Sequence, residues 1–141
     1  MKRSVVLTVA ESKRLIAKGV AALPEVQYAM ENGMVVVATG TTNAYVLQEI
    51  RGEKFDLRRY RSGITTPDVP EKSKEPIGEP IPDVVYKKGE VVKELNRYNA
   101  VKQMGKGDVY IKGANALNYE DQIAGVLIGG GRRHGIHAEI P

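Results

Sequence analysis

The sequence contains no cysteine and no tryptophan, and it has only one phenylalanine. Without thiols, disulfides, zinc–thiolate centres, iron–sulfur clusters and cysteine nucleophiles are all excluded. Aromatic residues make up only 6% of the chain, so aliphatic side chains must fill most of the core. The length of 141 residues predicts one domain, and the lack of cysteine is typical of proteins from a reducing compartment.

Long apolar runs and a strong charge of either sign are also missing. No stretch approaches the ~20 apolar residues that a membrane span needs. Charged residues interrupt the N-terminal apolar stretch soon after Leu7, which is not typical of a signal peptide. We therefore expect a cytoplasmic protein with no membrane partner.

The net charge of +4 is mild, and the basic residues are spread along the chain. The one local cluster comprises Arg58, Arg59 and Arg61 and also contains Tyr60. A nucleic-acid interface usually concentrates basic charge and interleaves it with aromatic rings. A solvated basic loop explains this short cluster better, so we do not expect a nucleic-acid partner.

Most of the prolines fall within residues 65–82, where they prevent both helix and strand. We interpret this segment as a loop that leaves and rejoins the domain. The predicted organisation is therefore a single α/β domain over residues 1–131 and a flexible tail over residues 132–141.

Local patterns predict the elements of this domain. Thr8 and Glu11 have the spacing of a capping box, so a helix should begin there. Pro24 suits the first turn of a second helix, which Gly33 would end with a left-handed cap. The run from Met34 to Ala38 is apolar without alternation, which predicts a strand buried on both faces.

Further elements follow the same reasoning. A helix is predicted from Asn43 to Arg51, and a hairpin should turn at Lys88 and Gly89. Asn96 can cap a short helix, and two later strands end in glycine-containing turns. This order predicts an α/β fold with three layers: a Rossmann-like, mostly parallel sheet with helices on both faces, plus the proline-rich excursion and the hairpin.

The turn from Thr39 to Asn43 is the strongest candidate site. It joins the buried strand to a helix N-terminus, where unpaired N–H groups and the positive end of the helix dipole meet. Three threonine hydroxyls and Gly40 suit a phosphate or carboxylate ligand, although a plain capped turn would look the same. The turn matches neither a Walker A loop nor a dinucleotide-binding glycine motif.

Two segments carry a resemblance to a known family. The stretch "YAMENGMVVVATGTTNAYVLQEIRGE" resembles the N-terminal phosphate-turn motif of type A ribose-5-phosphate isomerase. The stretch "DVYIKGANALNYEDQIAGVLIGGG" resembles a later segment of that enzyme, in which Asp-Gly-Ala-Asp-Glu follows a strand. The wider group includes glucosamine-6-phosphate deaminase and the CoA transferases, and the resemblance covers roughly a third of the chain.

The chain departs from this family at the catalytic positions. Lys112, Asn115 and Ala116 stand where the isomerase has three carboxylates. Asn115 and Ala116 cannot act as a general base near neutral pH, and Lys112 can do so only with a strongly depressed pKa. Ribose-5-phosphate isomerase activity is therefore not expected, and whether the chain catalyses any reaction stays open.

What the resemblance still implies is the ligand site. We expect a ligand to contact two groups of residues at the carboxyl ends of the strands. They are Thr39, Gly40, Thr41, Thr42 and Asn43 in the first segment, and Lys112, Gly113 and Asn115 in the second.

Two other candidate sites, both near the C-terminal end of the sequence, have weaker support. Gly129 to Gly131 could form an anion nest beside two arginines, but a flexible tail is the simpler interpretation. His134 and His137 have only Glu139 nearby, so we expect no metal site. No cofactor is expected either.

These observations leave three hypotheses. In the first, the chain binds a small phosphorylated or carboxylated metabolite at the turn. In the second, it is a non-enzymatic structural or regulatory module that forms oligomers with the same fold. In the third, it is a truncated version of a longer enzyme. A short sheet would expose an edge strand, which proteins usually cover, so we expect a homo-oligomer.

Overall fold

The structure is a computed structural model that describes residues 4–61 and 78–126. Most of the predicted proline-rich loop, the glycines at 129–131, both histidines and the predicted tail lie outside the described residues. The claims about them stay predictions.

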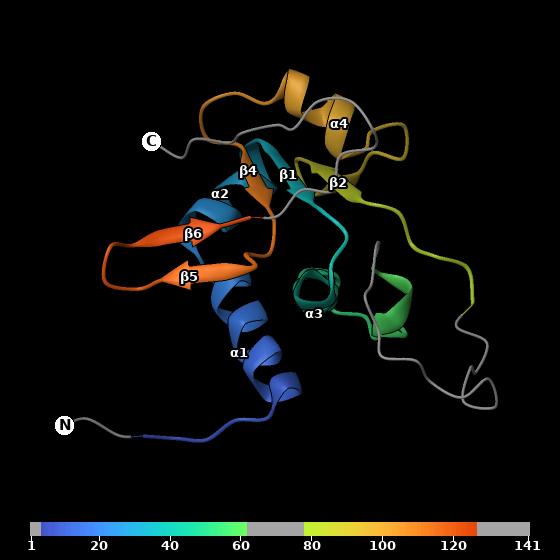
Figure 1. Cartoon of the computed structure of the whole chain (residues 1–141). Coiled ribbons are helices and arrows are strands. Elements are labelled where there is room, and N and C mark those ends of the chain that lie inside the picture. Colours follow the sequence, from blue (N-terminus) through green and yellow to red (C-terminus); the bar gives the residue numbers. More distant parts are fainter. Residues whose placement is uncertain (1–3, 62–77, 127–141) are drawn as a thin grey trace, which may run out of the picture.

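Four helices, two short 3-10 helices and six strands form the described chain (Figure 1). The helices are α1 (Val9–Ala21), α2 (Pro24–Asn32), α3 (Thr41–Arg51) and α4 (Arg97–Ala100), with 3-10 helices at Leu57–Arg59 and Val101–Gln103. The strands are β1 (Met34–Val37), β2 (Val84–Lys87), β3 (Glu90–Val91), β4 (Val109–Ile111), β5 (Ala116–Asn118) and β6 (Ile123–Gly125).

The main sheet has the strand order β3-β2-β1-β4, and this order corrects the predicted fold class. Only β1 and β4 pair in parallel, whereas β1 with β2 and β2 with β3 pair antiparallel. The prediction of a mostly parallel, Rossmann-like sheet is therefore wrong. All four residues of β1 are buried, as predicted, but a central strand of a mixed sheet covered on both faces gives the same apolar pattern.

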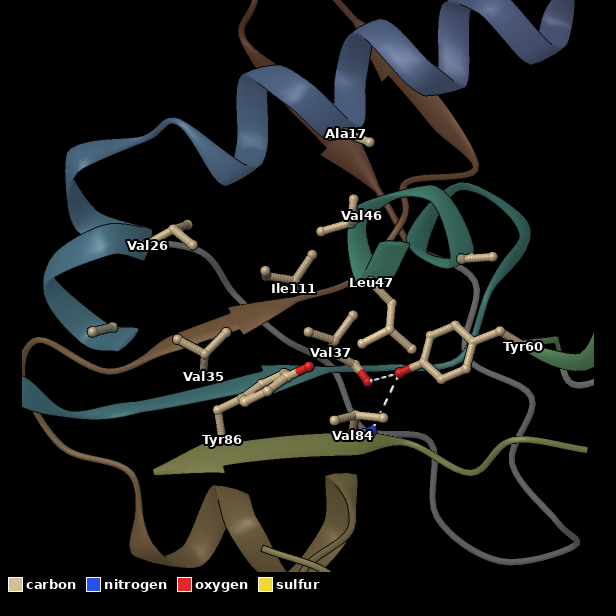
Figure 2. Packing of buried hydrophobic residues seen from close by; sticks show 12 residues of the cluster. Ala17, Val26, Val35, Val37, Val46, Leu47, Tyr60, Val84, Tyr86 and Ile111 are labelled. Carbon is tan, nitrogen blue, oxygen red and sulfur yellow. Dashed lines mark hydrogen bonds between the residues drawn. The ribbon is translucent and has the colours of Figure 1, made fainter. Parts of the chain in front are cut away.

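The α/β class and the two covered faces do match the structure. One face packs under α1, α2 and α3 and forms the larger core, which contains Val35, Val37, Leu47 and Ile111 (Figure 2). The other face packs under α4, where Val36 belongs to the smaller core. Alternate residues of β1 thus point into different cores, as strand geometry requires.

Several local predictions are confirmed because they depend on neighbouring residues alone. The Thr8 hydroxyl accepts a hydrogen bond from Glu11 N, and the Glu11 carboxylate accepts one from Thr8 N. Asn96 caps α4 in the same reciprocal way. The β2–β3 hairpin turns at Lys88 and Gly89, both at positive φ, which is the conformation of a tight two-residue hairpin turn.

Gly33 ends α2 as predicted, but not as a left-handed cap, because its φ is −132°. A different requirement explains glycine at this position. An added Cβ would lie 2.5 Å from the Asp108 carboxylate, which accepts hydrogen bonds from Met34 N at 2.7 Å and from Gly105 N at 2.8 Å. Gly33 therefore leaves room for the carboxylate that ties the start of β1 to the loop before β4.

We expect alanine at Gly33 to destabilise the fold by about 1–2 kcal/mol, because the Asp108 carboxylate must move and lose those bonds. Alanine at Gly19, in the last turn of α1 and with nothing within 4 Å of an added Cβ, should instead stabilise it by roughly 0.5–1 kcal/mol. Urea denaturation of the two variants measures both effects. Equal stability of the two variants would contradict this explanation of Gly33.

Tyr60 is the largest fully buried side chain, although it lies within the basic cluster of the sequence. Its hydroxyl donates to the Val37 carbonyl and accepts a hydrogen bond from Val84 N at 3.2 Å (Figure 2). The ring thus fills the core beside Leu47 and joins β1 to β2. The basic cluster is therefore not a plain solvated loop, because Tyr60 lies in the core and Arg58 and Arg59 belong to the 3-10 helix Leu57–Arg59.

The later strands differ most from the prediction. β5 and β6 pair antiparallel in a sheet of their own, which follows β4 as a separate hairpin (Figure 1). They do not extend the main sheet, so within residues 4–61 and 78–126 the strand β4 lies at its edge. None of the helices in these residues is long and apolar enough to cross a membrane.

Candidate functional site

The two predicted site segments lie side by side at one edge of the main sheet. Because β1 and β4 are parallel, their carboxyl ends reach the same edge. Ala38 N, just after β1, donates to the carbonyl of Ile111, the last residue of β4, at 3.1 Å. The turn from Thr39 to Asn43 and the segment after Ile111 therefore start from neighbouring points.

Asn43 fixes this junction. Its side-chain amide nitrogen donates to the carbonyl of Ala38 at 2.7 Å and to the carbonyl of Ile111 at 3.0 Å. These bonds use both amide hydrogens, and the side chain is only 3% exposed. Asn43 therefore joins the start of α3 to the ends of both strands, and its amide N–H groups are not available to a ligand.

Thr39 is held on both sides by a partly buried ion pair. Its backbone N–H donates to Asp83 Oδ1 at 2.8 Å, and its hydroxyl accepts from Arg97 Nη2 at 3.0 Å. The Asp83 carboxylate also binds Arg97 Nε at 2.7 Å, and its side chain is 7% exposed. A guanidinium that is fixed by a carboxylate thus reaches the turn from the α4 side of the sheet.

Gly40 is the N-cap residue of α3 but has no side chain that could cap the helix. Its N–H donates to the Tyr60 carbonyl at 3.0 Å, so this donor is already used. Its φ of 168° is extended backbone that any residue can adopt. The nearest atom to an added Cβ, in the Asn43 side chain, is 3.9 Å away, so the protein itself has room for a side chain here.

The first residues of α3 face solvent and a lysine. The Thr41 hydroxyl accepts a hydrogen bond from Lys13 Nζ of α1 at 3.0 Å. Thr41 is exposed and Thr42 is half-buried. Lys13 thus places a positive charge beside the positive end of the helix dipole. The helix has no side-chain cap and no acidic residue in its first turn, so no neighbouring carboxylate offsets this charge.

The predicted site residues of the second segment, Lys112, Gly113 and Asn115, do not all lie at the strand end. Lys112 is half-buried, and its Nζ donates to the carbonyl of Gly113 at 3.3 Å. An added Cβ on Gly113 would meet nothing within 4 Å. Asn115 is exposed, and its backbone N–H pairs with Gly125 at the base of the β5–β6 hairpin. Lys112 and Gly113 thus directly follow the strand end, whereas Asn115 belongs to the hairpin.

Three residues at the site escaped the sequence interpretation: Lys13, Asp83 and Arg97. Each contacts a threonine of the turn from a distant part of the sequence, since Lys13 is 28 residues from Thr41 and Arg97 is 58 residues from Thr39. No spacing rule connects such positions. Composition gives no signal either, because both cations are residue types that are common at any protein surface.

The donor set of the site suits an anion better than a cation. Threonine hydroxyls, helix N–H groups, Lys13 and Arg97 lie at the turn, and the Asp83 carboxylate is engaged with Arg97. Lys112 follows the neighbouring strand end. Within the described residues, no group of three or more His, Asp or Glu side chains could hold a metal ion. The arrangement can therefore bind negative charge by hydrogen bonds and cations.

Comparison with known proteins adds no relative. No protein-family model, no curated protein and no solved structure matches the chain.

Proposed function

We propose that the chain binds a small phosphorylated or carboxylated metabolite at the N-terminus of α3. The observation that carries the proposal is the ammonium group of Lys13, 3.0 Å from the Thr41 hydroxyl at this helix end. Two positive features lie together there, the lysine charge and the helix dipole, and the first turn offers no acidic residue to offset them. An anion at this point would be attracted by both.

The proposed contacts divide between the turn and its cations. We expect the hydroxyls of Thr41 and Thr42 and the N–H groups at the start of α3 to donate to the anion, and Lys13 to pair with its charge. Lys112, which follows β4 and now donates to the Gly113 carbonyl, is the second cation proposed for the site. Thr39, Asn43 and Gly40 already use the donors described above to hold the turn. They position the site, and a ligand meets mainly the first turn of the helix.

The proposal concerns binding and does not include ribose-5-phosphate isomerisation. At the positions of the family's carboxylates, Lys112 lies against the Gly113 carbonyl, and Asn115 and Ala116 begin the β5–β6 hairpin. None of them is a carboxylic acid that could move a proton between carbon atoms. The alternative of a non-enzymatic regulatory or structural module stays open, because ligand binding alone is compatible with it.

The experiment is a thermal and urea stability screen against inorganic phosphate, ribose 5-phosphate and acetate. A ligand at a hundred times its dissociation constant should stabilise the protein by about 2.7 kcal/mol. We expect Lys13→Gln to weaken phosphate binding roughly ten-fold, because it removes one charge-assisted hydrogen bond.

Lys87→Gln is the matched control, since Lys87 is exposed and pairs with Met34 at the opposite end of β1. It should leave binding unchanged. Gly40→Val provides a second check, because its side chain would lie over the turn while the extended backbone accepts it. If no anion stabilises the protein, or if Lys13→Gln and Lys87→Gln bind phosphate equally well, the proposal is wrong.

We further propose that copies of the chain associate through the edge of the main sheet. Strand β4 pairs only with β1 among the described strands, and an open strand edge presents unpaired N–H and C=O groups. Sedimentation velocity at micromolar concentration should show a species larger than a monomer. A single monomer peak would rule this association out.

The proposed compartment is the cytoplasm, which suits a chain without cysteine. Fractionation of the source cells, with the protein detected by antibody, checks it; recovery from the membrane or secreted fraction would contradict it.

A further inference from the structure

The outer face of α1 is apolar, although it is open to solvent in the described chain. Four large apolar residues on this face are between 47% and 70% exposed: Val9, Leu15, Ile16 and Leu23, which lies just beyond the helix end. The opposite face, with the fully buried Ala17, packs on α3 (Figure 2). A helix that is apolar on both sides is normally buried, so we expect another element to cover the outer face of α1.

The spacing of residues on this face is that of a helix-pairing seam. Alternating intervals of three and four residues separate Val9, Ser12, Ile16, Gly19 and Leu23, as in the a/d pattern of coiled coils. We call these five residues the outer seam. Two of them are small, and an added Cβ at Gly19 would meet nothing within 4 Å. The seam therefore favours a second helix as its partner, whose large side chains fit the gaps beside the small residues.

The outer seam is complementary to a second copy of itself. One antiparallel register of two α1 helices places Ser12 opposite Gly19 of the second copy and Leu15 opposite Ile16 of the second copy. Small residues then face small residues, which lets the helices approach closely, and large side chains pack beside them. Two-fold symmetry makes each of these contacts occur twice.

Charge complementarity supports the same register. Glu11 and Lys18 are exposed and lie about two helical turns apart, on one flank of the seam. In an antiparallel pair this flank meets the same flank of the second copy, and Lys18 lies about 3 Å along the helix axis from Glu11 of that copy. Both hydrogen bonds from Thr8 to Glu11 use Oε2, so Oε1 can accept from the lysine.

We infer that α1 pairs with α1 of a second copy of the chain in an antiparallel, two-fold symmetric dimer. This surface is distinct from the open edge of β4, and the inference does not rest on the proposed anion site. With 13 residues, α1 is about 20 Å long, so the contact is smaller than a standard protein–protein interface. We therefore expect a weak dimer, with a dissociation constant in the micromolar range.

Cysteine cross-linking tests the register directly, because the chain has no native cysteine. Ile16→Cys places one thiol of each copy beside the two-fold axis, so a short bis-maleimide should give a covalent dimer. In Leu23→Cys the two thiols lie about 20 Å apart along the axis, and no dimer should form. A mixture of Ser12→Cys and Gly19→Cys should cross-link more efficiently than either variant alone.

Sedimentation equilibrium of Ile16→Glu measures the contribution of the seam to association. We expect the dissociation constant to rise at least ten-fold, because the dimer would bury a carboxylate. Tyr28→Glu is the matched control, since Tyr28 is 59% exposed on α2, and it should leave the dissociation constant unchanged.

Each other outcome overturns a stated part of the inference. If the Ile16→Glu variant associates as tightly as the original chain and Ile16→Cys does not cross-link, the copies associate elsewhere, for example through β4. Self-cross-linking of Leu23→Cys would overturn the antiparallel direction. If the protein is a monomer and Ile16→Glu lowers its stability to urea, another part of the same chain covers α1, and the second copy is not its partner.

Discussion

Replacement of Tyr60 by leucine is expected to destabilise the protein by about 3–5 kcal/mol. The substitution removes a fully buried ring from the core and leaves the Val37 carbonyl and Val84 N–H without their partner. Tyr60→Phe is the matched variant, because it keeps the ring and removes only the hydroxyl. It should cost about 1–3 kcal/mol, and urea denaturation of both variants separates the contribution of the ring from that of the bridge between β1 and β2.

The same hydroxyl makes stability depend on pH in the alkaline range. Burial raises the pKa of Tyr60 well above its usual value of about 10, and the nearby Asp83 charge adds to the rise. Below pH 10, the folded and unfolded chains both keep the phenol proton, so this group does not make stability depend on pH. Above it, the unfolded chain loses the proton first, so stability falls as the pH rises.

Tyr60→Phe tests this dependence directly. Between pH 10 and 11.5, the slope of unfolding free energy against pH should be shallower in the variant by about one proton per molecule. The two proteins differ only at this hydroxyl, so the comparison isolates Tyr60. Identical slopes would show that the Tyr60 hydroxyl is not held protonated by the fold.

Replacement of Asp83 by asparagine is the second large effect that we expect, at about 2–3 kcal/mol of lost stability. The Arg97 side chain is 23% exposed and would keep its charge without its carboxylate partner, and removal of one member of a buried pair is costly. The expected loss of stability is smaller than for a fully buried pair because water still reaches the guanidinium. The bond from Thr39 N to Asp83 would also lose its charge assistance.

A double-mutant cycle with Arg97→Gln measures the pair itself. The double variant should be more stable than the sum of the single effects predicts, because neither partner is left alone with a buried charge. If the effects of Asp83→Asn and Arg97→Gln simply add, the two side chains do not stabilise each other. In that case Thr39 would be held by its surroundings rather than by the ion pair.

Sequence reasoning succeeded where a few neighbouring residues determine the outcome. The capping box at Thr8, the cap at Asn96 and the turn at Lys88 and Gly89 each depend on contacts within four residues, and all three are present. The turn after β1 was also located correctly, although α3 begins at Thr41 and not at Asn43.

The errors concern contacts between distant segments. A strand buried on both faces does not reveal the direction of its partners, so β1 could not show that β2 runs antiparallel to it. Tyr60 was assigned to a basic loop, because only the folded chain brings its ring under α3. For the same reason the sequence located the threonines of the site but not Lys13 or Arg97.

The pairing of β1 with β4 has a consequence for how the protein folds. The hydrogen bond from the Asn43 side chain to the Ile111 carbonyl, at the ends of these strands, joins residues 68 positions apart in the sequence. The bond from Met34 N to Asp108 joins residues 74 positions apart. Contacts of such high contact order close large loops before they gain any stabilisation, and they slow folding. We therefore expect the pairing of β4 with β1, and with it the candidate site, to form later in folding than the local β2–β3 hairpin.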